Sequence, residues 1–197
     1  MVETAMLAAL AGLAYTLFTT VGLDKYVGYF LPVAPIVAAL RNGSAACLRT
    51  VGATFVLLLV LQGPLRASVY FFLHGSMACV MGWAISRRVR WRVAVPAAAL
   101  ARVFGTLGYL AMTSWVMNEN LLRLLVSNVC TLLDQIAASM GTTGVPSPST
   151  VYGLIGVLLM VNGLAYSLLL HALYAVLLKG MGYTDIFVPK FFRKYGI

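Results

Sequence analysis

The sequence predicts an all-α integral membrane protein: a six-helix transmembrane bundle with an additional amphipathic helix between the fifth and last spans. The first observation is composition, because 61% of the 197 residues are hydrophobic and only 10% are charged, against about 25% in soluble domains. The second is a series of apolar stretches near the ~20 residues that cross a bilayer. The third is the concentration of basic residues in short loops between those stretches. Lipid must therefore cover much of the surface.

The chain is predicted to form a single transmembrane domain over residues 1–197. The first span, residues 3–23, ends at Asp24. The second, residues 26–40, contains Pro32 and Pro35, which break or kink helices, so we expect a distorted span or a re-entrant element there. The remaining spans are predicted at residues 45–62, 65–85, 93–117 and 151–178.

Residues 119–140 are predicted to form an amphipathic helix. Polar residues recur there at helical spacing, while leucine, valine and isoleucine fill the other faces. We expect this helix to lie at an interface or to line a cavity. A full seventh span would carry the basic tail, residues 179–197, to the side opposite the arginines of 87–92, which the distribution of positive charge disfavours.

Basic residues predict the orientation, because Lys and Arg accumulate on the cytoplasmic side of a membrane. With six spans, ten of the fourteen bases lie on the side that holds both termini. These ten are Arg41, Arg49, Arg87, Arg88, Arg90, Arg92, Lys179, Lys190, Arg193 and Lys194. Lys25, Arg66 and Arg123 lie on the other side, and Arg102 lies within the fifth span. Both termini are therefore expected on the cytoplasm-equivalent side.

Several classes of function are disfavoured. A net charge of +9 would suggest nucleic-acid binding in a soluble protein, but here topology explains the bases, so no nucleic-acid partner is expected. Catalysis needs a nucleophile with a base, paired carboxylates or a metal shell, and no such pattern occurs in the sequence. Cys47, Cys79 and Cys130 are odd in number and widely spaced. We predict a non-enzymatic protein with no catalytic residues, metal or cofactor.

Two ridges of small residues predict close helix contacts, because helices in lipid associate through close backbone approach at small side chains. One ridge lies on the first span and the other on the fifth. Internal packing and docking of a partner subunit are both open for each ridge, and we take both as candidate docking surfaces. Their residues are Ala5, Ala8, Ala9 and Gly12 on the first span, and Ala97, Ala101 and Gly105 on the fifth.

Polar residues inside spans are informative, because a charged, unpaired side chain at mid-membrane costs about 2.5–3.5 kcal/mol on insertion scales. Arg102 is the clearest case, roughly 12 Å into the fifth span. Its side chain can reach toward the interface or pair with Glu3. Asn162 and Tyr166 share one face of the last span, and His74 lies in the fourth. Interhelical hydrogen bonding and ligand binding are both open for these residues.

Short motifs are distributed along nearly the whole chain. They are Val2-Glu3-Thr4-Ala5 with Leu7-Ala8, Phe30-Leu31-Pro32-Val33 leading to Leu40-Arg41-Asn42-Gly43, Gln62-Gly63-Pro64 after the third span, and Asn162 with His171 in the last. Their order resembles a family of bacterial and cyanobacterial membrane proteins with plastid relatives. That family is itself similar to the substrate-capture, or S, subunits of energy-coupling-factor transporters.

The resemblance implies a function as well as a fold. S subunits have six helices, a ligand cavity open to the outside, and an alanine ridge on the first helix that meets the coupling subunit. Ala5 and Ala9 match that ridge, so the resemblance implies a subunit that captures a small molecule and docks on other membrane subunits. Loops 24–25 and 63–66 and the amphipathic helix would close the cavity. The candidate ligand-binding residues are Asn120, Arg123, Asp134, Asn162 and Tyr166.

The alternative is a structural or assembly subunit of a larger membrane complex, such as a protein translocon or a photosynthetic assembly. That role predicts that partner proteins cover both ridges and the amphipathic helix, and that no ligand-sized polar cavity exists. A capture subunit predicts the cavity. Either role places the protein in a bacterial plasma membrane or a plastid membrane, with its termini on the cytoplasmic or stromal side.

Overall fold

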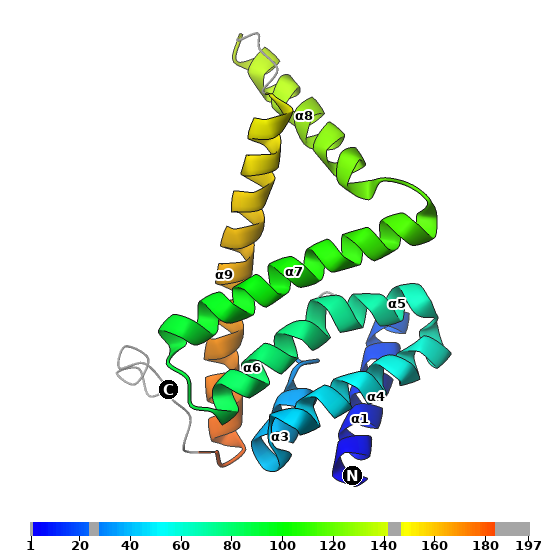
Figure 1. The fold of residues 1–197 in the computed structure, drawn as a ribbon, viewed down its shortest axis with the longest axis vertical. Helices are drawn as coiled ribbons and strands as arrows, with labels where there is room; N and C mark the ends of the chain where they lie inside the picture. The colour runs from blue at the N-terminus through cyan, green and yellow to red at the C-terminus, as the bar shows by residue number, and fades with distance from the viewer. Residues whose placement is uncertain (1, 24–27, 142–146, 184–197) are drawn as a thin grey trace.

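The computed structural model describes residues 2–23, 28–141 and 147–183, and the structural statements below concern these ranges (Figure 1). No strand occurs within them, so the all-α fold class is confirmed. The helices are α1 (Val2–Val21), α3 (Val33–Asn42), α4 (Ser44–Gln62), α5 (Pro64–Val69), η1 (Tyr70–Gly75), α6 (Ser76–Ser86), α7 (Trp91–Met117), α8 (Leu121–Ser139) and α9 (Pro148–Gly180).

Among the described residues, six helices are long and apolar enough to cross a membrane. They are α1, α4, the continuous rod α5–η1–α6, α7, α8 and α9. A shorter apolar helix, α3, completes the set. The predicted bundle of six long helices with one additional helix is therefore found.

The lengths of two helices differ from those expected. Among the described residues of the span expected at 26–40, the helix is α3, which has ten residues, ends at Asn42 and is about 15 Å long. Pro32 precedes the helix and Pro35 lies in its first turn, where a missing N–H removes no helical hydrogen bond. The helix expected to be the additional one, α8, has 19 residues and spanning length.

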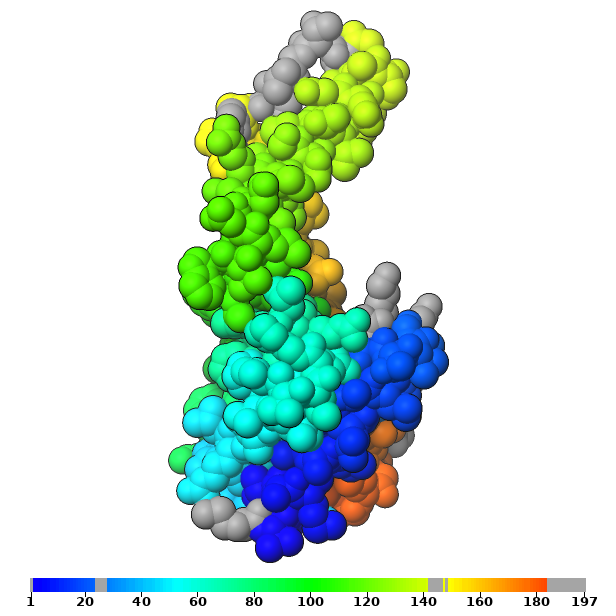
Figure 2. All heavy atoms as spheres, turned by 90° about the vertical axis from the view of Figure 1, so that its right-hand side faces the viewer, coloured from blue at the N-terminus to red at the C-terminus, as the bar shows by residue number. Residues whose placement is uncertain are grey.

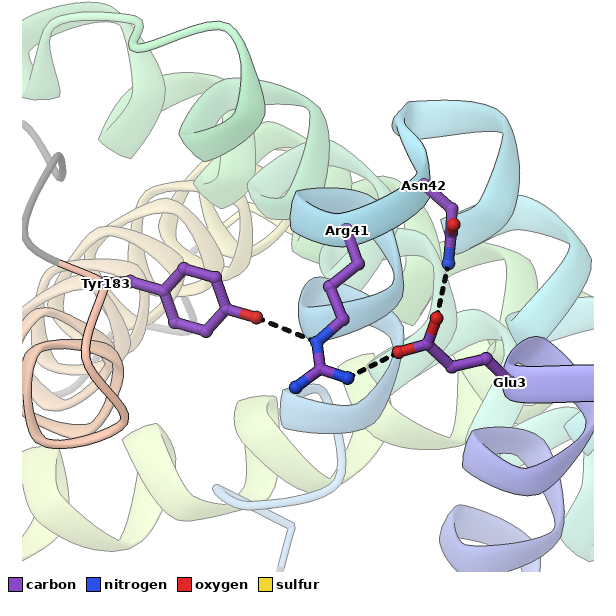
Figure 3. Close-up of polar contacts among 4 residues, drawn as sticks. All are labelled: Glu3, Arg41, Asn42 and Tyr183. Carbon is purple, nitrogen blue, oxygen red and sulfur yellow. Dashed lines mark hydrogen bonds and ion pairs between the residues drawn. The ribbon is translucent and has the colours of Figure 1, made fainter.

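Three chain segments meet at one end of the molecule (Figure 3). Glu3, at the start of α1, accepts a hydrogen bond from Nη1 of Arg41 at 2.6 Å. Its second carboxylate oxygen accepts one from Nδ2 of Asn42 at 3.0 Å. Nε of Arg41 donates to the hydroxyl of Tyr183 at 2.9 Å. The start of α1, the end of α3 and the turn after α9 therefore lie together.

These contacts fix the direction in which each helix runs. α1 runs away from the Glu3 end, and residues 28–42 return to it. α4 runs away again, because its last residue, Gln62, reaches the far end of α1: Nε2 of Gln62 donates to Oγ1 of Thr19 at 2.6 Å. The rod α5–η1–α6 returns toward the Glu3 end, because Sγ of Cys79 in α6 lies 3.9 Å from Sγ of Cys47 in the first turn of α4. α7 then leaves and α9 returns to Tyr183. Between them, α8 links the far end of α7 to the part of the chain that precedes α9.

Two clusters of buried side chains form the core. One joins α1, α4 and η1 and includes Tyr15, Val51, Leu58 and Tyr70. The other joins α3, α6, α7 and α9 and includes Ile36, Met77, Ala98, Leu170 and Tyr174. Buried hydrogen bonds connect the helices as well, because the hydroxyl of Ser167 donates to the carbonyl of Val95 at 3.0 Å. This packing positions the middle of the bundle, where the candidate site lies.

The far end of α7, together with α8 and the first half of α9, projects beyond this core. In Figure 1, α8 rises from the end of α7 and meets the start of α9, so the three helices outline a triangle. Figure 2 shows this part as a narrower projection above the lower part of the molecule. α9 has 33 residues, so it is about 50 Å long, against ~30 Å of hydrocarbon. We call α8 together with residues 147–161 the arm.

Candidate functional site

A cavity of about 400 Å³ with both polar and apolar side chains in its wall lies in the middle of the bundle, between α1, the rod α5–η1–α6, α7 and α9. Its volume is within the range of small-molecule sites, roughly 300–1,000 Å³. We call it the Arg102 cavity. The residues that line it are Tyr15, Gly28, Tyr29, Val69, Leu73, His74, Arg102, Asn162 and Tyr166.

Arg102 carries the one formal charge among the described residues of the cavity wall. It lies about 16 Å along α7 from Trp91, which is membrane depth. The carbon of its guanidinium group is 3.6 Å from the centroid of the Tyr166 ring, a distance at which the ring face attracts a cation. Its Nη1 atom is buried and has no hydrogen-bond partner within the described residues.

No acidic side chain neutralises Arg102 within the described ranges. The carboxylate of Glu3, which the sequence allows as a partner, pairs instead with Arg41 at 2.6 Å. Two further acids, Asp24 and Asp185, lie outside the described residues. A positive charge at membrane depth therefore borders the cavity without a described counter-charge, an arrangement typical of functional sites in membrane proteins.

Tyrosine rings shape the wall around this charge. The ring centroids of Tyr29 and Tyr166 are 5.2 Å apart. The carbonyl of Tyr29 accepts a hydrogen bond from the hydroxyl of Tyr174 at 2.6 Å, which holds the segment before α3 against α9. The Tyr15 ring packs edge-on against Tyr70, with centroids 5.8 Å apart. Planar apolar faces and a cation are thus combined in one cavity.

The π-helix η1 places His74 in the wall. π-helical turns are rare and often occur at functional sites. The hydroxyl of Ser76 donates to the carbonyl of Phe72 at 2.5 Å, and Gly105 of α7 lies directly against that carbonyl, because a Cβ there would collide with it. The close approach of α7 to η1 brings Arg102 to the same cavity as His74.

The predicted ligand-binding residues are divided between places. Asn162 and Tyr166 line the Arg102 cavity. Asn120 caps α8, since its Oδ1 accepts a hydrogen bond from the backbone N–H of Arg123 at 3.0 Å, and it lines a second cavity of about 520 Å³ between α7 and α8. Arg123 is exposed and Asp134 half-buried, and neither lines either cavity. The separation arises because α8 projects from the bundle instead of folding over it.

The ridge on α1 also divides in two. Ala8 and Gly12 are buried. The carbonyl of Ala8 accepts a hydrogen bond from Oγ1 of Thr54 at 3.3 Å, and a Cβ at Gly12 would collide with the Leu57 side chain. Ala5 and Ala9 are exposed. One half of the ridge therefore packs on α4, and the other half is uncovered by the described residues.

The ridge on α7 is largely used inside the chain. Gly105 is buried against the carbonyl of Phe72. Ala97 and Ala101 are half-buried. The uncovered small residues of the molecule's predicted docking surfaces are thus Ala5 and Ala9 on α1.

The sequence indicates some of the cavity residues but not others. Arg102, Asn162 and Tyr166 stand out as polar groups within apolar helices. Tyr15 and Tyr29 carry no such signal, because aromatic side chains in apolar segments are typical of ordinary packing. Only the fold brings them to the guanidinium group.

Comparison with known proteins supports the membrane class. A family model described as "Predicted membrane protein (DUF2232)" matches residues 5–195. No curated protein and no solved structure matches the chain. With six helices of spanning length and apolarity, the family match shows an integral, multi-pass membrane protein.

Proposed function

The chain belongs to the DUF2232 family of membrane proteins, and on that premise we propose a non-enzymatic subunit that captures a small molecule in the Arg102 cavity. The observation that carries this proposal is the ligand-sized cavity itself, bordered by Arg102, whose buried Nη1 has no hydrogen-bond partner among the described residues. An ionisable group inside a membrane marks a ligand or ion pathway by default, because the cost of placing it there must be offset.

The resemblance to S subunits of energy-coupling-factor transporters supports the same role. In that role Ala5 and Ala9, which are exposed on α1, dock the protein on a partner membrane subunit by close helix approach. The sequence has no nucleotide-binding motif, so the energy for release of the ligand comes from partner subunits.

The proposed orientation follows from the basic residues. The end that holds Glu3, Arg41 and the arginines after α6 faces the cytoplasm of a bacterium or the stroma of a plastid. Tyr15 and Arg102 of the cavity wall lie about 20 Å and about 16 Å along their helices from this end, near the middle of the bundle. Capture from outside therefore requires a path to the cavity from the opposite end.

Native mass spectrometry of the protein, extracted gently from its own membrane, tests the proposal. We expect a bound small molecule whose mass is lost in Asn162→Leu, since that substitution removes an amide from the cavity wall. Asn128→Leu is the matched control, because Asn128 is an exposed residue of α8. Absence of any bound molecule, or its equal retention in both variants, would contradict the proposal.

A structural or assembly subunit of a larger complex is the second candidate. The observation in its favour is α8, in which only Val126 is fully buried, so the exposed side chains of this helix are available to lipid or to partner helices. Identification of co-purifying subunits distinguishes the two roles. ATPase and coupling subunits support capture, whereas translocon or photosynthetic subunits support assembly.

A further inference from the structure

We propose that the molecule captured in the Arg102 cavity is a carboxylate with a planar apolar body, the carboxylate bound by Arg102 and the body packed against tyrosine rings. This inference rests on the proposed function and adds the chemical class of the ligand. It is argued from three features of the cavity: its charge, the Nη1 atom of Arg102 that has no hydrogen-bond partner among the described residues, and the rings beside it.

The positive charge of Arg102 indicates that the ligand is negatively charged. Arginine stays protonated in proteins, so half-buried Arg102 brings a full positive charge to the cavity wall. Desolvated charges are stable when they are paired and hydrogen-bonded. Within the described residues no carboxylate is paired with Arg102, whereas Arg41 has Glu3. An anionic ligand supplies the missing partner.

The geometry of the guanidinium group selects among anions. Tyr166 covers one face of it at 3.6 Å, which leaves the N–H groups at the edge, and Nη1 has no hydrogen-bond partner among the described residues. Parallel N–H donors at that edge match the two oxygens of a carboxylate. One cation in the described wall balances one negative charge, which favours a monoanionic carboxylate over a doubly charged phosphate.

The remaining wall suits a flat, apolar body. The Tyr29 and Tyr166 rings pack against each other in this wall, with centroids 5.2 Å apart, and Val69 and Leu73 add aliphatic surface. Aromatic rings favour offset or edge-on contacts with other planar groups. A volume of about 400 Å³ accommodates a fused two-ring acid.

A matched pair of probes tests the inference on the wild-type protein. Binding of 2-naphthoate and of its neutral analogue 2-naphthamide is measured by equilibrium dialysis with the full chain in phosphatidylcholine nanodiscs, with empty nanodiscs as the partition control. We expect naphthoate to bind at least about tenfold more tightly, as a hydrogen bond to a charged group provides. Equal affinity, or binding of neither probe, overturns the inference.

Substitutions test whether Arg102 is the source of the preference for naphthoate. Arg102→Gln is expected to abolish the preference for naphthoate, and Arg102→Lys to reduce it, because lysine keeps the charge without the planar donor edge. Arg123→Gln removes the same charge from an exposed position on α8 and should leave the preference unchanged. An unchanged preference in a folded Arg102→Gln protein contradicts the assignment.

Two further results separate this inference from its alternatives. Replacing part of the lipid by phosphatidylglycerol should not displace naphthoate; displacement would assign the site to a lipid headgroup and overturn the soluble carboxylate. Detection of a neutral bound molecule by native mass spectrometry would overturn the carboxylate while leaving capture intact. Detection of no bound molecule would overturn the proposed function.

Discussion

The bundle and the arm both consist of helices apolar enough to cross a membrane, but they differ in packing. In the bundle, α4 buries Ala46, Cys47, Thr50, Val51, Thr54 and Leu58. In the arm, α8 is of the same length and is apolar enough to span a membrane, yet buries only Val126. Leu124, Leu132 and Ile136 of α8 are all more than half exposed.

This contrast teaches that apolarity alone does not pack helices in a membrane. Lipid tails are as apolar as leucine, so association depends on close backbone contact and on interhelical hydrogen bonds. The bundle has both, at Gly12, Gly105 and Gly163 and at the hydroxyls of Thr54 and Ser167. Between the described parts of α8 and its neighbours such devices are scarce, so lipid or a partner is left to cover the arm.

The largest effect is expected where a glycine touches backbone. Gly105→Ala should lower the free energy of unfolding by about 3 kcal/mol, because the new methyl group meets the carbonyl of Phe72 and forces α7 away from η1. Gly156→Ala in the arm is the matched control, since nothing lies within 4 Å of a Cβ there. Unfolding in mixed micelles, followed by circular dichroism, measures both. Equal losses would remove the distinction between bundle and arm.

The two halves of the α1 ridge offer a second test. Ala8→Leu should lower the free energy of unfolding by about 2 kcal/mol, because Ala8 is buried against α4. Ala9→Leu, one position away and exposed, should change it by less than about 0.5 kcal/mol.

The same pair tests docking, with co-purification of partner subunits as the readout. We expect Ala9→Leu to reduce it, since a bulky side chain separates closely packed helices. Retained complexes in Ala9→Leu would exclude that face as the docking surface.

A smaller effect is expected at the hydrogen bond between α7 and α9. Ser167→Ala should cost about 1 kcal/mol, because the buried hydroxyl donates to the carbonyl of Val95 at 3.0 Å and such bonds in membranes have modest net value. Ser149→Ala, at an exposed position near the start of α9, should cost nothing measurable in the same unfolding assay. A loss at both sites would indicate a general effect on the helix.

Much of the fold follows from the sequence because hydropathy and length define apolar helices locally. Residues 45–62, predicted as a span, form α4 from Ser44 to Gln62. The length of α3 was harder to predict from the sequence, because the apolar run of 26–40 does not reveal how much of it is helical. For α8, polar residues at helical spacing indicate two faces, but no local signal states what covers them.

The candidate site could be predicted from the sequence only in part. Arg102 and Asn162 are conspicuous as polar groups in spans, and the structure brings both to one cavity. Asn120 satisfies its own helix cap instead, a role that its position before α8 could have suggested. The sequence could not predict which half of the α1 ridge is buried. Ala8 and Ala9 are the same residue type, and only the fold shows that Ala8 lies on the side of α1 that packs on α4.

The path of the arm across or along the membrane is tested most directly by labelling single cysteines from each side. In a cysteine-free background, Val89→Cys marks the loop after α6, while Glu119→Cys and Ser139→Cys mark the two ends of α8. With an impermeant maleimide on sealed vesicles of known orientation, we predict that Glu119→Cys and Ser139→Cys react from the same side, opposite to Val89→Cys. Reaction of Ser139→Cys from the side of Val89→Cys would make α8 a full crossing and contradict this topology.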